Sequence, residues 1–177
     1  QELTTFNDVY IDSTGFGWVV GDGGTILHTT DFGQSWEDQS DLLNGNLFHL
    51  AYVPGSNGQQ AVAAGTKIVV TADGGQSWQA WIPVTNFGAY QGVAAPSAQA
   101  IYVTTNQGKL FKSQDGGATF DVLPTLPIAI EWTDIAFWND SLGWLGSREG
   151  DLLRTTDGGQ SWEVLHDTTF TSRLEFT

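Results

Sequence analysis

The acidic side chains are the first residues of this sequence that could do chemistry, because two carboxylates can act together as general acid and general base. Asp8 in "FNDVYI" and Asp134 in "WTDIAF" occupy equivalent positions in two related stretches. An inverting glycosidase needs such a pair about 6.5–9.5 Å apart, with room for a water molecule between them. The plainer interpretation, which we favour, is that both residues lie at the solvated ends of strands.

Other catalytic chemistries find little support in the residue types. The chain has 3 histidines and no cysteine, which excludes thiolate catalysis and cysteine-bound zinc. The histidines show no metal-ligand spacing, and no nucleophilic triad or Gly-rich nucleotide motif is present. The "GDGG" stretch at residues 21–24 lacks the lysine of a phosphate-binding loop and is predicted to be a hairpin turn. The sequence therefore predicts no metal and no cofactor.

A short motif of a hydroxyl residue, Asp, Gly and an aromatic residue occurs four times, each copy 42 residues after the last. Its glycine permits a tight turn, its carboxylate can accept hydrogen bonds from backbone N–H groups of that turn, and its aromatic ring can pack beneath it. This strict register indicates duplication, so a structural role is predicted for the repeated residues. They are Asp31, Asp73, Asp115, Asp157, Trp36, Trp78, Phe120 and Trp162.

The stretches between the motifs favour strands. No apolar period of 3.6 residues persists, glycine is frequent, and β-branched and aromatic residues gather in four short runs per unit. Four antiparallel strands per 42 residues is typical of a β-propeller blade and leaves no residues for the helices of a solenoid. We predict an all-β fold and a single domain over residues 1–177, with blades at approximately 5–40, 47–82, 89–124 and 131–166.

The number of blades in the complete ring is left open. Residues 171–177 match the start of a further blade, so the chain is predicted to hold four blades and the beginning of a fifth. Such a chain could be part of a larger ring, or an arc completed by another copy. A self-contained four-bladed ring is the third alternative.

Residues that break the repeat are candidates for binding, because every blade shares the structural duties. Trp81, Trp132 and Trp138 have no aromatic counterpart in the other units. Exposed, they could form a platform for a sugar or a peptide, although we favour packing between blades. Steps of 42 residues also align a polar column that is predicted to line the mouth of the central channel. This column consists of Asn7, His49, Gln91 and Thr133.

The composition narrows the class of partner. With 20 acidic and 6 basic residues the net charge is −14, which disfavours nucleic acid and anionic membranes as partners because like charges repel. No stretch approaches 18 apolar residues, so no membrane insertion is expected. The chain begins with Gln and carries no signal-like segment, which favours a processed or trimmed form, and we expect an exported protein, periplasmic or extracellular.

The repeated motif resembles the Asp-box, or bacterial neuraminidase repeat, with the form S/T-x-D-x-G-x-x-W/F. Asp-boxes are found in sialidases, xyloglucan-type endoglucanases, sortilin-like receptors and photosystem II assembly factors, where they lie away from the active face. The fuller string "GWLGSREGDLLRTTDGGQSWEVL" is more particularly similar to the photosystem II stability and assembly factor type and its non-photosynthetic bacterial relatives. That resemblance implies a seven-bladed, exported scaffold that binds proteins and is not an enzyme.

The chain departs from the photosynthetic members in its arginines. Those members carry an arginine-rich patch, whereas the arginines here are Arg148, Arg154 and Arg173. A chlorophyll-protein partner is therefore not expected, and the arginine cluster of a sialidase is missing.

The leading hypothesis is a non-catalytic, exported propeller that binds a protein partner, alone or with a further copy of itself. The alternative is a glycan-binding propeller or a fragment of a glycoside hydrolase, for which Trp132, Asp134 and Trp138 are the residues to test. A third, simpler hypothesis is that the chain is only a structural repeat within a surface protein.

Overall fold

The structure is a computed structural model that describes residues 4–40, 45–81, 87–124, 126–127 and 131–165. Within these residues the chain forms sixteen β-strands and one short 3-10 turn, η1 (Asp22–Gly24), and no α-helix. The strands make four separate antiparallel sheets of four strands each. This confirms the predicted all-β propeller architecture.

Each sheet is a meander of consecutive strands. The first contains β1 (Phe6–Ile11), β2 (Gly17–Gly21), β3 (Ile26–Thr29) and β4 (Glu37–Asp38). The second contains β5 (Leu47–Tyr52), β6 (Ala61–Gly65), β7 (Ile68–Thr71) and β8 (Gln79–Trp81). The third contains β9 (Tyr90–Ala94), β10 (Ile101–Thr105), β11 (Leu110–Ser113) and β12 (Asp121–Val122). The fourth contains β13 (Trp132–Phe137), β14 (Gly143–Ser147), β15 (Leu152–Thr155) and β16 (Glu163–Val164).

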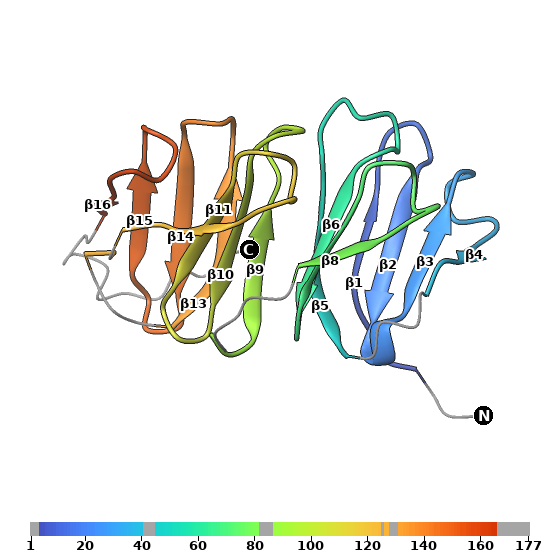
Figure 1. Ribbon diagram of the computed structural model, residues 1–177, viewed down its shortest axis with the longest axis horizontal. Helices are drawn as coiled ribbons and strands as arrows, with labels where there is room; N and C mark the ends of the chain where they lie inside the picture. The colour runs from blue at the N-terminus through green and yellow to red at the C-terminus, as the bar shows by residue number, and fades with distance from the viewer. Residues whose placement is uncertain (1–3, 41–44, 82–86, 125, 128–130, 166–177) are drawn as a thin grey trace, which may run out of the picture.

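The sheets follow one another across the molecule in chain order, from the first sheet at one end to the fourth at the other (Figure 1). The first strands of successive sheets, β1, β5, β9 and β13, adjoin each other and form the inner edge. The four sheets span residues 6–38, 47–81, 90–122 and 132–164, and the single domain over residues 1–177 with its blade bounds stays a prediction. The predicted start of a further blade at 171–177 lies outside the described residues.

Every inner strand carries a β-bulge at the same place, one residue after the strand begins to pair with its neighbour. The bulge inserts one unpaired residue, which bends the strand and increases its twist. The bulged residues are Asn7, Phe48, Gln91 and Thr133.

The register corrects one column of the sequence alignment. His49 pairs with Ala64 directly after the bulge of β5, as Asp8 pairs with Val20 after the bulge of β1. His49 therefore belongs with Asp8, Gly92 and Asp134, whereas the 42-residue step had placed it with Asn7. The physical reason is that β5 enters the sheet one residue early.

The hydrophobic core lies between the sheets, in three clusters. Between the first and second sheets, Trp18 and Ile26 of the first pack with Val69 and Trp78 of the second. The next two interfaces are built alike, because the Asp-box aromatic residue of the later sheet belongs to one cluster with apolar strand residues of the sheet before it. Ile68 and Phe120 share one of these clusters, and Leu110 and Trp162 share the other.

Candidate functional site

The four Asp-box turns lie between the third and fourth strands of each sheet, at the edge away from the inner strands. In the first turn, Asp31 Oδ1 accepts hydrogen bonds from the Thr29 hydroxyl at 2.8 Å and the Ser35 N–H at 2.9 Å. Its Oδ2 accepts the Ser35 hydroxyl at 2.6 Å. The Thr29 hydroxyl in turn accepts the Gly33 N–H at 2.9 Å. The carboxylate thus holds its own turn closed.

The same network is present in the other three turns, with the same donors and acceptors. The hydrogen bond from the hydroxyl of Ser35, and then that from its N–H, holds the pKa of Asp31 at about 2. Corresponding donors lower the pKa of Asp115 and Asp157 to about 2, and that of Asp73 below its ordinary value. These carboxylates stay ionised and serve their own loops, an arrangement unsuited to a general acid.

A second group of candidates lies on the inner strands, which face the middle of the arc. Asp8 bridges two sheets, because its Oδ1 accepts the Val9 N–H and its Oδ2 accepts the Leu50 N–H of β5, both at 2.8 Å. Asp134 repeats the first of these bonds, accepting the Ile135 N–H at 2.8 Å. In Asp8 both carboxylate oxygens are therefore engaged in holding strands.

His49 on β5 occupies the same position, directly after the bulge, as Asp8 on β1 and Asp134 on β13. Burial lowers its pKa, while the negative charges of Asp8 and Asp134 act in the opposite direction. Both carboxylates are therefore within electrostatic range of His49, which places residues of β1, β5 and β13 around one region of the inner edge. We call Asp8, His49 and Asp134 the inner rim.

The other residues of the predicted polar column differ in their roles. The Asn7 side chain donates to the Leu47 carbonyl at 2.8 Å and to Asp22 Oδ1 at 3.0 Å, so it ties the first sheet to the second. Thr133 is exposed and donates to the Gly146 carbonyl at 3.3 Å. Gln91 is half-buried beside Gly92 on β9.

The three unmatched tryptophans separate into two classes. Trp132 is completely buried in the cluster between the third and fourth sheets, so it packs between blades, as we favoured above, and the alternative of a binding platform is wrong for this residue. Trp81 packs against Phe111 and Phe120 of the third sheet, with ring centroids 5.5 and 5.0 Å away. Trp138 is 80% exposed and borders a shallow hollow formed with the connection at Pro96 and Ser97.

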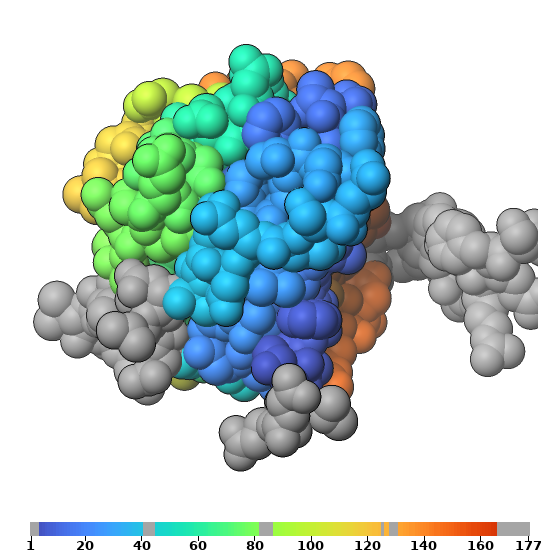
Figure 2. Space-filling model, turned by 90° about the vertical axis from the view of Figure 1, so that its right-hand side faces the viewer, coloured from blue at the N-terminus to red at the C-terminus, as the bar shows by residue number. Residues whose placement is uncertain are grey.

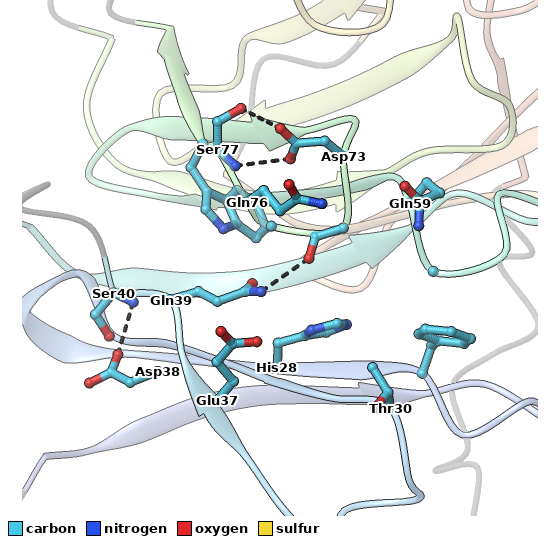
Figure 3. Close-up of a pocket in the computed structure, with 15 residues that line it drawn as sticks. His28, Thr30, Glu37, Asp38, Gln39, Ser40, Gln59, Asp73, Gln76 and Ser77 are labelled. Carbon is cyan, nitrogen blue, oxygen red and sulfur yellow. Dashed lines mark hydrogen bonds between the residues drawn. The ribbon is translucent and has the colours of Figure 1, made fainter.

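A larger pocket of about 580 Å³ lies between the outer parts of the first and second sheets. Figure 3 shows Glu37 and His28 of the first sheet facing Gln76 and Asp73 of the second. Its lining comes from two successive repeats, and for this reason no single motif of the sequence marks it. The pocket is also lined by Phe16, Gln39, Gln59 and Trp78.

The pocket is framed by a bridge between the sheets. Gln39 donates to the Gly74 carbonyl at 3.0 Å and accepts the Trp18 indole N–H at 3.3 Å. His28 stacks on Trp18 with ring centroids 4.7 Å apart, and burial lowers its pKa. With Glu37, Asp38 and Asp73 among its lining residues and no lysine or arginine, the pocket is unsuited to anions.

Cofactor and membrane features are not found in the part of the chain that the structure describes. There, no three His, Asp or Glu side chains are grouped to hold a metal ion. No helix within the described ranges is long and apolar enough to cross a bilayer. At the inner rim, the carboxylates of Asp8 and Asp134 accept hydrogen bonds and can attract positive charge.

The chain matches one protein-family model, and its fold is similar to several solved structures. A family model described as "Photosynthesis system II assembly factor YCF48" matches residues 2–125. No curated protein matches the chain.

Solved structures show the same fold at low sequence identity. A structure of YCF48 bound to D1 peptide is 18% identical, with a TM-score of 0.61, over 95% of this chain and 84% of that one. YCF48 from Cyanidioschyzon merolae is 18% identical, with a TM-score of 0.67, over 91% and 56%. The GH74 xyloglucanase from Xanthomonas campestris is 13% identical, with a TM-score of 0.74, over 93% and 31%. The chain therefore spans only part of the length of these proteins.

Proposed function

Since the chain belongs to the photosynthesis system II assembly factor YCF48 family, we propose that it is a non-catalytic scaffold that binds a segment of another protein. A similar fold, YCF48, has been solved with a D1 peptide bound to it. We extend this mode of action to the present chain, with a partner of different chemistry.

The observation that carries the proposal is the engagement of the carboxylates. All four Asp-box acids accept hydrogen bonds from their own turns, and both oxygens of Asp8 accept backbone N–H groups. These hydrogen bonds lower the pKa of the four Asp-box acids, which are therefore not poised to exchange protons. Asp8 and Asp134 accept backbone N–H groups of the inner strands, a geometry that favours holding strands over hydrolysis.

We place the partner segment at the inner rim and assign it a positive charge. Asp8 and Asp134 present carboxylates there, and the whole chain carries a net charge of −14, which favours encounter with basic segments. Asp134 has one oxygen that accepts no hydrogen bond from the described residues. This oxygen is the proposed contact for a lysine or arginine side chain.

We also propose that the protein acts outside the cytoplasm. The resemblance to exported assembly factors supports this location. Fractionation of cells that produce the protein, followed by immunoblotting, tests it directly. Recovery with the cytoplasmic fraction alone would contradict the location.

The binding proposal is tested with a labelled, extended peptide of alternating lysine and serine, measured by fluorescence anisotropy against the full chain. We expect saturable binding that weakens as salt rises, and no binding of a matched glutamate–serine peptide. Asp134→Asn should weaken binding by roughly 2- to 5-fold, as expected for an exposed charge contact.

Glu149→Gln is the matched control, because Glu149 is also exposed but lies in the β14–β15 hairpin. It should bind the peptide as the wild type does. Equal weakening in both variants would mean that net charge alone attracts the peptide, and the assignment to the rim would be wrong.

A glycan ligand is the second candidate, favoured by the exposed indole of Trp138 and its neighbouring hollow. Aromatic rings stack on sugar faces. Under the scaffold proposal, a glycan array and hydrolysis assays on aryl glycosides and xyloglucan stay blank. A signal that Trp138→Ala abolishes would favour the glycan ligand instead.

A further inference from the structure

In two of the sheets, the third strand carries a basic residue directly opposite an acidic residue of the fourth strand. Lys112 pairs with Asp121 in the third sheet, and Arg154 pairs with Glu163 in the fourth. The Arg154 guanidinium donates to Glu163 at 3.1 Å. Opposite charges that lie directly across from each other on neighbouring strands stabilise a sheet.

The first sheet breaks this pattern. Glu37 pairs with His28 at the same position. Burial lowers the pKa of the His28 imidazole, so the ring is neutral at pH 7. Glu37 forms no ion pair with any residue that the structure describes. It therefore faces a neutral ring where the acids of the third and fourth sheets face a cation.

Where the third sheet meets the fourth, the chain supplies a cation to the interface from its own sequence. The Lys112 ammonium donates to the Gly158 carbonyl of the next Asp-box turn at 2.9 Å and lies 5.1 Å from the centre of the Tyr102 ring. A carbonyl oxygen and an aromatic face both attract a positive charge. This interface shows how an ammonium group fits between two successive sheets.

The equivalent place between the first and second sheets belongs to the pocket of about 580 Å³. The equivalent residues, two repeats apart, are His28 for Lys112, Trp18 for Tyr102 and Gly74 for Gly158. His28 stacks on Trp18 and carries no ammonium group. The Gly74 carbonyl accepts the Gln39 amide at 3.0 Å and keeps a second lone pair. The pocket thus has the walls of the later interface without its cation.

One buried atom of the pocket lacks a hydrogen-bond partner. The His28 side chain is only 7% exposed, and its Nε2 atom forms no hydrogen bond with the described residues. Figure 3 shows this ring beside the Glu37 carboxylate, inside the pocket. A neutral imidazole nitrogen can accept a hydrogen bond, and an ammonium group has three to donate. A buried polar atom is costly to leave unpaired, so a ligand that donates to Nε2 gains affinity.

We propose that this pocket binds an alkylammonium group from outside the chain, with Glu37 as its counter-ion and His28 Nε2 as its hydrogen-bond acceptor. Asp38 and Asp73 add negative charge to the lining, which contains no lysine or arginine. The outer parts of both sheets reach the surface in Figure 2, where the first sheet is blue and the second green, so a partner can approach the pocket.

A lysine side chain of a partner protein and a free amine both carry this group, and the choice of probes separates the two sources. The site lies away from the inner rim, between the outer strands of two sheets. The inference goes beyond the binding function proposed above and does not depend on it.

Titration of the 15N-labelled full chain with n-butylammonium tests the site by NMR. We expect saturable shifts of the indole N–H signal of Trp78, which lines the pocket, and no shift for Trp138, which borders a different hollow. Neutral n-butanol should leave both signals unchanged. The peptide acetyl-Gly-Lys-Gly-amide carries the same group: binding about tenfold tighter than n-butylammonium identifies a protein lysine as the source, and equal or weaker binding identifies a free amine.

Two variants test the proposed contacts. Glu37→Gln keeps the shape of the side chain and removes its charge, so it should weaken n-butylammonium binding by about 3-fold or more. Asp121→Asn is the matched control, because Asp121 has the same position in the third sheet, opposite Lys112. It should bind as the wild type does. His28→Lys supplies an ammonium group from within, as Lys112 does, and should abolish binding while circular dichroism shows a folded chain.

Three results would overturn the proposal. Equal shifts of Trp78 and Trp138 would show that the cation is attracted to the acidic surface in general. Equal weakening in Glu37→Gln and Asp121→Asn would show that net charge alone governs binding. Undiminished binding by a folded His28→Lys would show that the ligand does not occupy the position of the Lys112 ammonium.

The inner rim is told apart from the pocket by one further variant. Asp134→Asn, which should weaken the lysine–serine peptide at the rim, should leave the n-butylammonium shifts of Trp78 as they are in the wild type. Loss of these shifts in Asp134→Asn would contradict a separate site. Either binding proposal can therefore fail while the other stands.

Discussion

At the scale of single residues, each Asp-box carboxylate acts on its immediate neighbours. In Asp115, for example, the carboxylate oxygens accept hydrogen bonds from one N–H group and two hydroxyl groups of the same turn. Because these donors favour the ionised form, the pKa of Asp115 falls to about 2. The turn is consequently held most firmly when the acid is charged.

The first prediction concerns the stability of the protein at low pH. A carboxyl group whose pKa is lower in the folded than in the unfolded protein contributes stability above its ordinary pKa and loses it as the pH falls. The urea midpoint of the wild type should therefore stay level down to about pH 4 and fall between about pH 4 and pH 2. Asp115→Asn should have a lower midpoint at pH 7 and a shallower fall in acid.

Asp121→Asn provides the comparison for this prediction. Asp121 is exposed at the start of β12, and its carboxylate makes none of the Asp-box hydrogen bonds. Its curve should follow that of the wild type. If Asp115→Asn and the wild type lose stability in parallel through acid, the hydrogen-bonded carboxylate is not the cause.

At the scale of elements, the inner strands come unusually close at Gly92. A Cβ atom at this position would lie 3.1 Å from Asp134 Cα and 3.0 Å from the Thr104 hydroxyl. Both distances are tighter than ordinary packing, and one partner is backbone. Gly92 therefore lets β9 and β13 approach and brings Asp134 toward the rim.

The second prediction follows from that close approach. Gly92→Ala should destabilise the protein by about 1–3 kcal/mol, since overpacking a well-packed interior forces the backbone apart. Gly146→Ala on β14 is the matched control, because a Cβ atom there meets nothing within 4 Å. Urea denaturation should leave Gly146→Ala near the wild type. Equal loss in both variants would point to glycine flexibility rather than to crowding.

The sequence predicted the strands and the Asp-box turns well because both depend on local features. Turn glycines, hydroxyls and short apolar runs act within a few residues of each other, and their repeat reveals them. The fold of each blade could therefore be derived without knowledge of its neighbours.

The exact register of the inner rim could not be predicted, because three length changes in the second repeat cancel. Its inner strand begins one residue early. Its first connection, between Tyr52 and Ala61, spans eight residues, against five between Ile11 and Gly17. Its next hairpin, between Gly65 and Ile68, spans two residues, against four between Gly21 and Ile26. The Asp-box thus returns to its place while His49 is displaced by one position.

The difference between Trp132 and Trp138 and the pocket beside His28 could not be predicted from the sequence, which favoured packing for both tryptophans. Both depend on which face of a blade meets the next blade, and this is a property of two repeats rather than one. Trp132 is the first residue of β13 and is buried, whereas Trp138 follows the last residue of that strand and is exposed. Composition alone does not separate them.

At the scale of the whole molecule, the repeated packing of one sheet on the next bears on how such proteins change over evolutionary time. Each sheet presents the same two faces to its neighbours, so any sheet can stand beside any other. A duplication or loss of a whole 42-residue unit leaves the surviving units with ready-made contacts. We expect gene-level gain and loss of repeats to alter circumference in this lineage while leaving the individual folding unit intact.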